Sequence, residues 1–120
     1  MSVLVDTNIA LYLLGGDAAV ADILAGQSLH VSFVTELELL GYPGLTDSDE
    51  GAVRAFLADS IVVGLSDRIT RETIRIRKSA RLKLPDAIIA ATALVERLPL
   101  VTADRGFLGL ADLPLVLYDP

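Results

Sequence analysis

The sequence contains no cysteine and no tryptophan, and only one methionine and one histidine among its 120 residues. Without cysteine, neither a disulfide framework nor a cysteine-based zinc site can form. No segment approaches the roughly 20 unbroken apolar residues that span a bilayer. The N-terminus lacks a basic region, and Asp6 and Asn8 interrupt its apolar run. We therefore expect a cytoplasmic protein with no signal peptide and no membrane partner.

Aromatic residues make up only 5% of the chain, so Leu, Val, Ile and Ala have to fill a core. Hydrophobic residues make up 52% of the chain, which is too apolar for a disordered protein. We expect one domain over residues 1–120, long enough to fold without disulfides or structural metals. The net charge of −6 argues against a strong nucleic-acid binder. However, seven of the ten basic residues fall within residues 68–83, so a basic face on an acidic protein is an alternative.

Short apolar runs rich in β-branched residues alternate with helical patterns along the chain. The apolar runs predict strands over residues 2–5, 30–34, 61–65, 100–102 and 115–118. Capping residues, glycine stops and a first-turn proline predict helices over residues 8–14, 17–25, 48–58, 67–79 and 85–97. This alternation predicts an α/β fold with helices on both faces of a sheet. It leaves the strand order open.

Four carboxylates lie at the ends of these predicted elements. Asp6, Glu38 and Asp104 follow the first, second and fourth predicted strands, and Asp86 lies in the first turn of the last predicted helix. Ligands of open α/β sheets bind beyond the carboxyl ends of the strands. Carboxylates gathered there would raise one another's pKa, and only Arg105 is a basic neighbour in sequence. A hard divalent cation such as Mg²⁺ or Mn²⁺ would resolve this repulsion.

Each acid also has a purely structural explanation. Asp6 could cap the helix that follows it, and Glu38 completes a capping box that starts at Thr35. Asp86 would be stabilised by its helix dipole without any metal, and Asp104 begins a turn-like DRG tripeptide. Taken singly, each residue favours the structural explanation. Taken together, the four placements favour a metal site.

The stretches VLVDTN, VSFVTELELLG, LPDAIIAATAL and LVTADRGF resemble the PIN domain, in this order. Within that superfamily, the chain looks most like the VapC-type toxin ribonucleases. The resemblance implies a three-layer α/β/α sandwich around a mainly parallel five-stranded sheet of order 3-2-1-4-5. It implies that the site consists of metal-binding, catalytic acids and of two residues that support them by hydrogen bonds. The acids are Asp6, Glu38, Asp86 and Asp104, and the supporting residues are Asn8 and Thr102.

The resemblance also selects between two neighbouring glutamates, Glu36 and Glu38. The family pattern places the ligand immediately before LLG, which favours Glu38. The implied activity is hydrolysis of RNA by one or two Mg²⁺ or Mn²⁺ ions. The implied partners are an RNA substrate, a cognate VapB-like antitoxin and a second copy of the chain.

Residues 67–79 carry a separate expectation about RNA binding. Arg71, Arg75 and Lys78 follow i, i+4, i+7 spacing and would form one phosphate-facing stripe. Ile69 and Ile76, seven residues apart, would anchor another side of the same helix in the core. A solvated helix surface explains the same charges equally well.

Two other functions compete with the nuclease. One is a non-catalytic PIN-like module that binds RNA or protein. The other is a Mg²⁺-dependent phosphatase or receiver domain, although a D-x-D pattern is absent where Asn8 follows Asp6 by two residues. The single histidine, His30, lies near a strand start and is expected to be structural.

Overall fold

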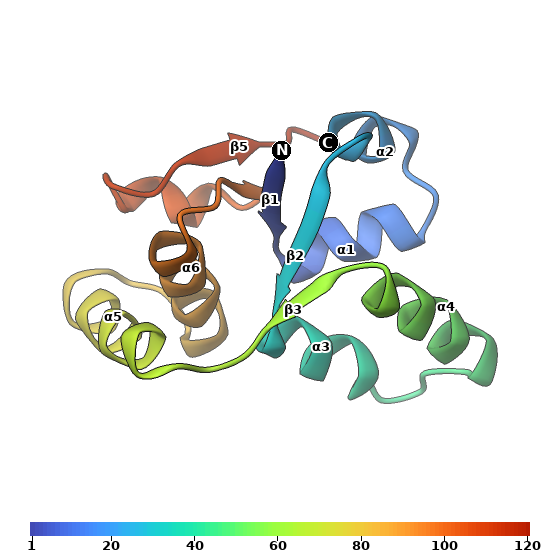
Figure 1. The fold of residues 1–120 in the computed structure, drawn as a ribbon, viewed down its shortest axis with the longest axis horizontal. Coiled ribbons are helices and arrows are strands. Elements are labelled where there is room, and N and C mark those ends of the chain that lie inside the picture. Colours follow the sequence, from blue (N-terminus) through green and yellow to red (C-terminus); the bar gives the residue numbers. More distant parts are fainter.

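The computed structural model describes residues 1–120 and contains one all-parallel, five-stranded sheet of order β3-β2-β1-β4-β5 (Figure 1). The order implied by the resemblance is confirmed. It differs from the order 2-1-3-4-5 of receiver domains, so the prediction of a receiver domain is wrong. The strands are β1 (Ser2–Val5), β2 (Ser28–Ser32), β3 (Ile61–Val63), β4 (Leu100–Thr102) and β5 (Leu115–Leu117).

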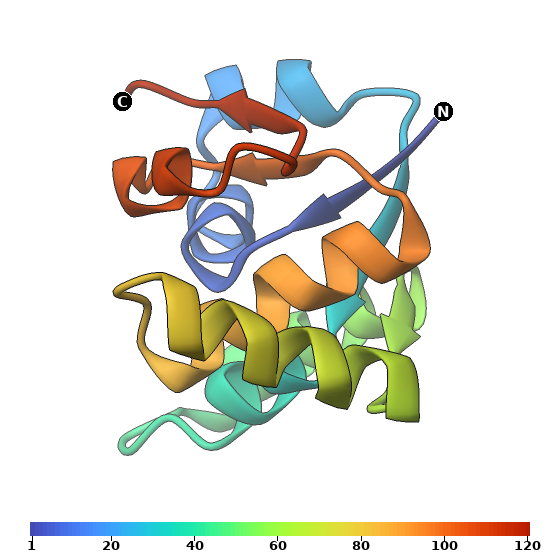
Figure 2. The ribbon, with the colours of Figure 1, turned by 90° about the vertical axis from the view of Figure 1, so that its left-hand side faces the viewer.

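Helices cover both faces of the sheet, as the sequence predicted. One face carries α5 (Asp67–Ser79) and α6 (Leu84–Glu96), which lie side by side with α5 on the outside (Figure 2). The other face carries α1 (Thr7–Leu14), α2 (Ala18–Leu24), α3 (Phe33–Leu40) and α4 (Asp47–Ala58). A 3₁₀ helix, η1 (Arg105–Gly109), links β4 to β5. No single helix could cross a membrane; α1 and α2 together have the length and composition, but they are bent 116° apart.

The central strand β1 is buried on both sides. Leu4 packs in the core beneath α5 and α6, whereas Val3 and Val5 pack in the core beneath α1 to α4. Such burial explains why the strand is a continuous apolar run rather than an alternating one. Leu4 pairs with His30 of β2 on one side and with Leu100 of β4 on the other.

The predicted strand over residues 30–34 is wrong at both ends. Strand β2 begins at Ser28 and stops at Ser32, and α3, which the sequence did not predict as an element, begins at Phe33. The Ser32 hydroxyl accepts a hydrogen bond from the Val34 N–H at 3.1 Å and caps α3. This cap ends the strand although the residues beyond it have high strand propensity. The capping box from Thr35 is therefore wrong as well, because Thr35 already lies inside the helix.

The remaining boundaries agree more closely with prediction. The five predicted helices match α1, α2, α4, α5 and α6 to within one residue at each end. Strands β3 and β5 are shorter than predicted and end at Val63 and Leu117.

Candidate metal centre

The four predicted acids line one hollow of about 110 Å³ beyond the carboxyl ends of β1 and β4. Each acid comes from a different place in the chain: the end of β1, the last turn of α3, the start of α6 and the start of η1. The hollow is lined by Asp6, Thr7, Asn8, Glu38, Asp86, Ile89 and Asp104. The neighbouring Glu36 does not line it.

Asp6 is both a helix cap and part of the hollow. Its Oδ1 accepts a hydrogen bond from the Ile9 N–H at 2.9 Å, and its Oδ2 accepts one from the Thr102 hydroxyl. Only 4% of the residue is exposed. Burial raises the pKa of Asp6, although both hydrogen bonds lower it, and the nearby Asp104 and Glu38 raise it further. The cap that the sequence predicted for Asp6 is therefore confirmed, and the same side chain lines the hollow.

Thr102, the last residue of β4, connects two of the acids. Its buried hydroxyl donates to Asp6 and accepts from the Asp104 N–H at 3.0 Å. Asp104 in turn caps η1, because its Oδ1 accepts from the Gly106 N–H at 2.8 Å. A Cβ atom at Gly106 would lie 3.0 Å from that oxygen, so glycine allows the close approach. The family resemblance implied a supporting role for Thr102, and its hydroxyl contacts Asp6 and the Asp104 backbone.

Asp86 differs from the other acids because no protein group donates a hydrogen bond to its side chain. It is half-buried as the third residue of α6. Burial raises its pKa, and Asp104, Asp6 and Glu38 raise it further, while Lys83 partly opposes them. The repulsion that the sequence analysis expected therefore acts mainly on Asp86 and Asp6. Lys83 is the N-cap residue of α6 and lies three residues before Asp86, so the two are not adjacent in the sequence.

The donor set suits a hard cation. As the side chains stand, no group of three or more acidic or histidine residues could enclose a metal ion. Mg²⁺, however, keeps several of its waters and needs only one or two protein carboxylates. The hollow offers carboxylate oxygens from four residues, none of which is in an ion pair with a basic side chain. Such oxygen ligands fit Mg²⁺ or Mn²⁺. The lining contains no thiolate or imidazole, which are ligands that zinc favours.

Asp86→Asn is expected to stabilise the metal-free protein at neutral pH, with a melting temperature a few degrees higher. Because the folded-state pKa of Asp86 is raised above its ordinary value of 3.8, the charged form disfavours folding. That penalty is complete above the folded-state pKa and disappears as the pH falls through it toward 3.8. Thermal melts in the presence of chelator, from pH 4 to pH 8, should show the increase in melting temperature only near pH 8.

Asp49→Asn is the matched control for this prediction. Asp49 is also the third residue of its helix, α4, so both substitutions lose the same favourable interaction with a helix dipole. Asp49 lies outside the carboxylate hollow, and its substitution should bring no gain. An equal gain in both variants would show that repulsion among the four acids is not the cause.

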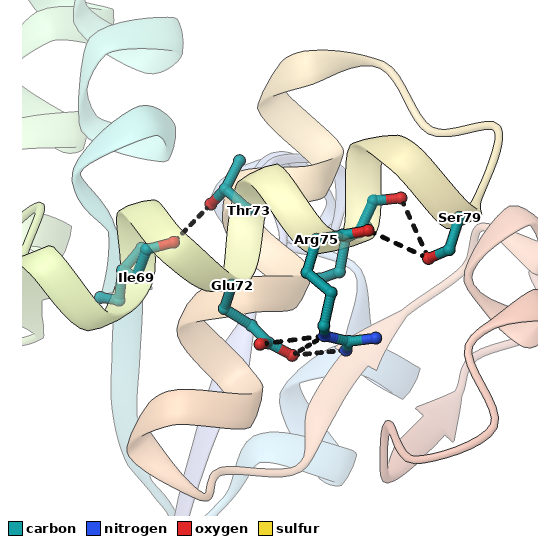
Figure 3. A network of polar contacts seen from close by, with 6 residues as sticks. Ile69, Glu72, Thr73, Arg75 and Ser79 are labelled. Carbon is teal, nitrogen blue, oxygen red and sulfur yellow. Dashed lines mark hydrogen bonds and ion pairs between the residues drawn. The ribbon is translucent and has the colours of Figure 1, made fainter.

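The predicted RNA-binding stripe is exposed, but one of its charges is already neutralised. Arg71, Arg75 and Lys78 are all exposed on α5. The Arg75 Nε donates to the two carboxylate oxygens of Glu72 at 3.0 and 3.1 Å, and Figure 3 shows its guanidinium turned toward that residue. Only Arg71 and Lys78 are therefore free of an ion pair within the stripe.

The opposite side of α5 is buried as predicted. Ile69 and Ile76 have no exposed surface, which confirms that they anchor the helix in the core. The buried Thr73 between them satisfies its hydroxyl by donating to the Ile69 carbonyl at 2.7 Å (Figure 3).

Comparison with known proteins identifies the family of this chain and several structures that share its fold. The family model of the PIN domain matches residues 3–113. A chain in a toxin–antitoxin complex from Klebsiella pneumoniae is 30% identical, with a TM-score of 0.84 over 98% of this chain and 99% of that one. A chain of VapBC2 from Rickettsia felis, bound to a promoter DNA fragment, is 21% identical, with a TM-score of 0.85 over 99% and 100%.

A chain of VapBC-1 from nontypeable Haemophilus influenzae is 24% identical, with a TM-score of 0.80 over 98% of both chains. At these lower identities the likeness to the second and third chains shows the shared fold alone. A search of curated proteins found no match.

Proposed function

This chain belongs to the PIN-domain family, and from that premise we propose that it is a metal-dependent endoribonuclease that hydrolyses RNA phosphodiester bonds. One observation carries the proposal. Carboxylates from four separate elements line one hollow at the carboxyl ends of the central strands, and none of them is in an ion pair with a basic side chain. A structural role would leave this repulsion uncompensated.

The four acids would divide the work between holding Mg²⁺ or Mn²⁺ and handling water. When bound, such an ion supplies a water of lowered pKa and stabilises negative charge on the leaving oxygen. Asp6 and Asp104 would be the primary ligands, because Thr102 and the Gly106 N–H hold their carboxylates in place. Asp86 and Glu38 would hold a second ion or orient water. Asn8, which lines the hollow, would support them by hydrogen bonds.

Cleavage assays test this proposal directly. Purified protein incubated with a structured RNA and Mn²⁺ should cut the RNA, and excess chelator should abolish the cutting. A preparation of an Asp104→Asn variant, made in the same way, controls for contaminating host nuclease. Binding of RNA without any metal-dependent cutting would instead support the non-catalytic module.

The basic residues of α5 would guide RNA toward the hollow. Arg71→Glu together with Lys78→Glu should weaken RNA binding and flatten its dependence on salt concentration, because fewer counterions are released. Arg75→Glu should have a smaller effect, because Glu72 already neutralises that guanidinium. RNA binding to the protein in the presence of chelator, measured by fluorescence anisotropy from 50 to 300 mM salt, gives the dependence of affinity on salt concentration. An unchanged slope in the double variant would mean that these two residues do not bind RNA and are only solvated.

We also propose that the chain is the toxin of a VapBC-type pair, acting in the cytoplasm as a homodimer. A groove of about 620 Å³ adjoins the hollow and shares Thr7, Asn8 and Glu38 with it. Its walls are largely apolar, and Tyr42 is 66% exposed beside it. A segment of a VapB-like antitoxin would cover this surface.

Co-expression with the product of an adjacent gene should yield a complex without nuclease activity. Tyr42→Asp should weaken that complex but leave cleavage by the free toxin unchanged. Light scattering of the free protein should give the mass of a dimer. A monomer, or a complex that cuts RNA at the rate of the free protein, would contradict this assignment.

A further inference from the structure

Thr7 makes a contact that the nuclease proposal does not use. It is the first residue of α1, immediately after Asp6, and its side chain reaches α3. The Thr7 Oγ1 lies 2.7 Å from Glu38 Oε1 and 3.0 Å from the Thr35 Oγ1. Thr35 and Glu38 are three residues apart on α3 and therefore share one side of that helix. The first turn of α1 is thus tied to α3 by hydroxyl groups.

The number of protons fixes the direction of these hydrogen bonds. An ionised carboxylate only accepts, so the single hydroxyl proton of Thr7 goes to Glu38. The Thr7 oxygen then accepts from Thr35, whose side chain has no exposed surface and no other hydrogen-bond partner. The chain of donors therefore runs from Thr35 through Thr7 to Glu38.

We propose that Thr7 is a positioning residue that holds the Glu38 carboxylate at the hollow, with Thr35 orienting the Thr7 hydroxyl. The inference rests on the proposed function, in which Glu38 holds an ion or orients water. Glu38 is exposed, and the hydrogen bond from Thr7 is the only one that the protein donates to its carboxylate. A glutamate side chain that is not held samples many rotamers, and the loss of that rotamer freedom opposes metal binding.

Asp6 and Thr7 are adjacent in the sequence, yet their side chains contact different elements. Asp6 faces β4 through Thr102, while Thr7, the next residue, faces α3 through Glu38. The start of α1 therefore contacts both β4, through Thr102, and α3, through Glu38. Partners outside the direct ligands commonly change metal affinity about 10- to 100-fold when they are removed.

Mn²⁺ binding by the purified protein, measured by isothermal titration calorimetry, tests the inference without relying on activity. Thr7→Val removes the hydroxyl at nearly constant volume and should weaken Mn²⁺ binding about 10-fold. Thr7→Ser keeps the hydroxyl and should restore wild-type affinity. In a Glu38→Ala background, Thr7→Val should bring no further loss, because the residue that it positions is gone.

Two variants separate positioning from simple destabilisation. Thr35→Val leaves the bond from Thr7 to Glu38 in place and should reduce Mn²⁺ affinity less than Thr7→Val does. Thr7→Val alone leaves the buried Thr35 hydroxyl without its partner, which costs stability. The double variant Thr7→Val/Thr35→Val removes that orphaned group and should recover the melting temperature while keeping the loss of Mn²⁺ affinity.

A measurement on the metal-free protein distinguishes failure of this inference from failure of the nuclease proposal. Three-bond NMR couplings of Glu38 should report one side-chain rotamer in the wild type and in Thr7→Ser, and averaged rotamers in Thr7→Val. Equal couplings in all three proteins would overturn the inference, as would wild-type Mn²⁺ affinity in Thr7→Val. If the wild type neither binds Mn²⁺ nor cuts RNA, the proposed function fails, and the couplings still decide whether Thr7 positions Glu38.

Discussion

Asp104→Asn is expected to reduce Mn²⁺-dependent RNA cleavage more than about 100-fold while the protein stays folded. Removing groups that only support a metal ligand commonly costs about 10- to 100-fold, so removing the charge of a ligand should cost more. Asparagine keeps an oxygen that can accept from the Gly106 N–H, so the cap of η1 should survive. Initial rates of cleavage, with circular dichroism as the check on folding, measure both halves of this prediction.

Asp112→Asn supplies the matched control. Asp112 is an exposed acid in the same connection between β4 and β5, but it lies outside the carboxylate hollow. Its substitution changes the net charge equally and should leave the cleavage rate near that of the wild type. Comparable losses in both variants would mean that the overall charge matters and not the hollow.

Asp6→Asn should abolish cleavage as well, but with a different effect on stability. Removing the negative charge should stabilise the folded protein, because burial and the neighbouring acids raise the pKa of Asp6. The asparagine amide nitrogen, however, cannot accept the proton that the Thr102 hydroxyl donates to Asp6, so this buried donor would lose its partner. We therefore expect Asp104→Asn to be the cleaner test. Cleavage that continues undiminished in both variants would exclude the proposed mechanism.

Phe107→Ala is expected to have the largest effect on stability, a loss of about 3–5 kcal/mol. Phe107 is 1% exposed and is the largest of the fully buried side chains. Because the core is otherwise aliphatic, no neighbouring aromatic ring could fill the cavity. A loss of this size is a large fraction of the roughly 5–15 kcal/mol that stabilises most proteins. Urea denaturation followed by circular dichroism would measure it.

Leu108→Ala is the adjacent control, since Leu108 is 56% exposed in the same 3₁₀ helix. Substitutions at such surface positions usually change stability by less than about 0.5 kcal/mol. Phe107 also anchors the segment that begins at Asp104, so its loss should reduce cleavage even in molecules that remain folded. Equal stability of the two variants would show that the ring does not hold the core.

Much of the local structure could be predicted because local signals decide it. The helix over residues 67–79 matches α5 at both ends, since Ser66 caps its start and the isoleucine spacing marks its buried side. The strand over residues 30–34 failed because the apolar pattern crosses the boundary without a break. There, the side-chain cap at Ser32 outweighed the strand propensity of Phe33 and Val34.

The candidate site was only partly predictable. The placement of Asp6, Glu38, Asp86 and Asp104 at element ends, together with the family resemblance, identified the acids that line the hollow. Thr7 was missed, because a threonine beside a predicted helix cap carries no signal until its partner on α3 is known. The stripe on α5 was drawn from spacing alone, which could not show that Glu72 pairs with Arg75.

By itself, the sequence determined the α/β class, the sizes of most helices and the presence of an acid at each of four element ends. Periodicity and capping act between residues within a turn or two of one another, so they are visible in the linear chain. The tertiary structure alone decided which polar groups far apart in the chain touch. Thr102 meets Asp6 across 96 positions, and Thr7 meets Glu38 across 31. Such contacts exist only after the parallel strands and their crossovers bring distant residues together.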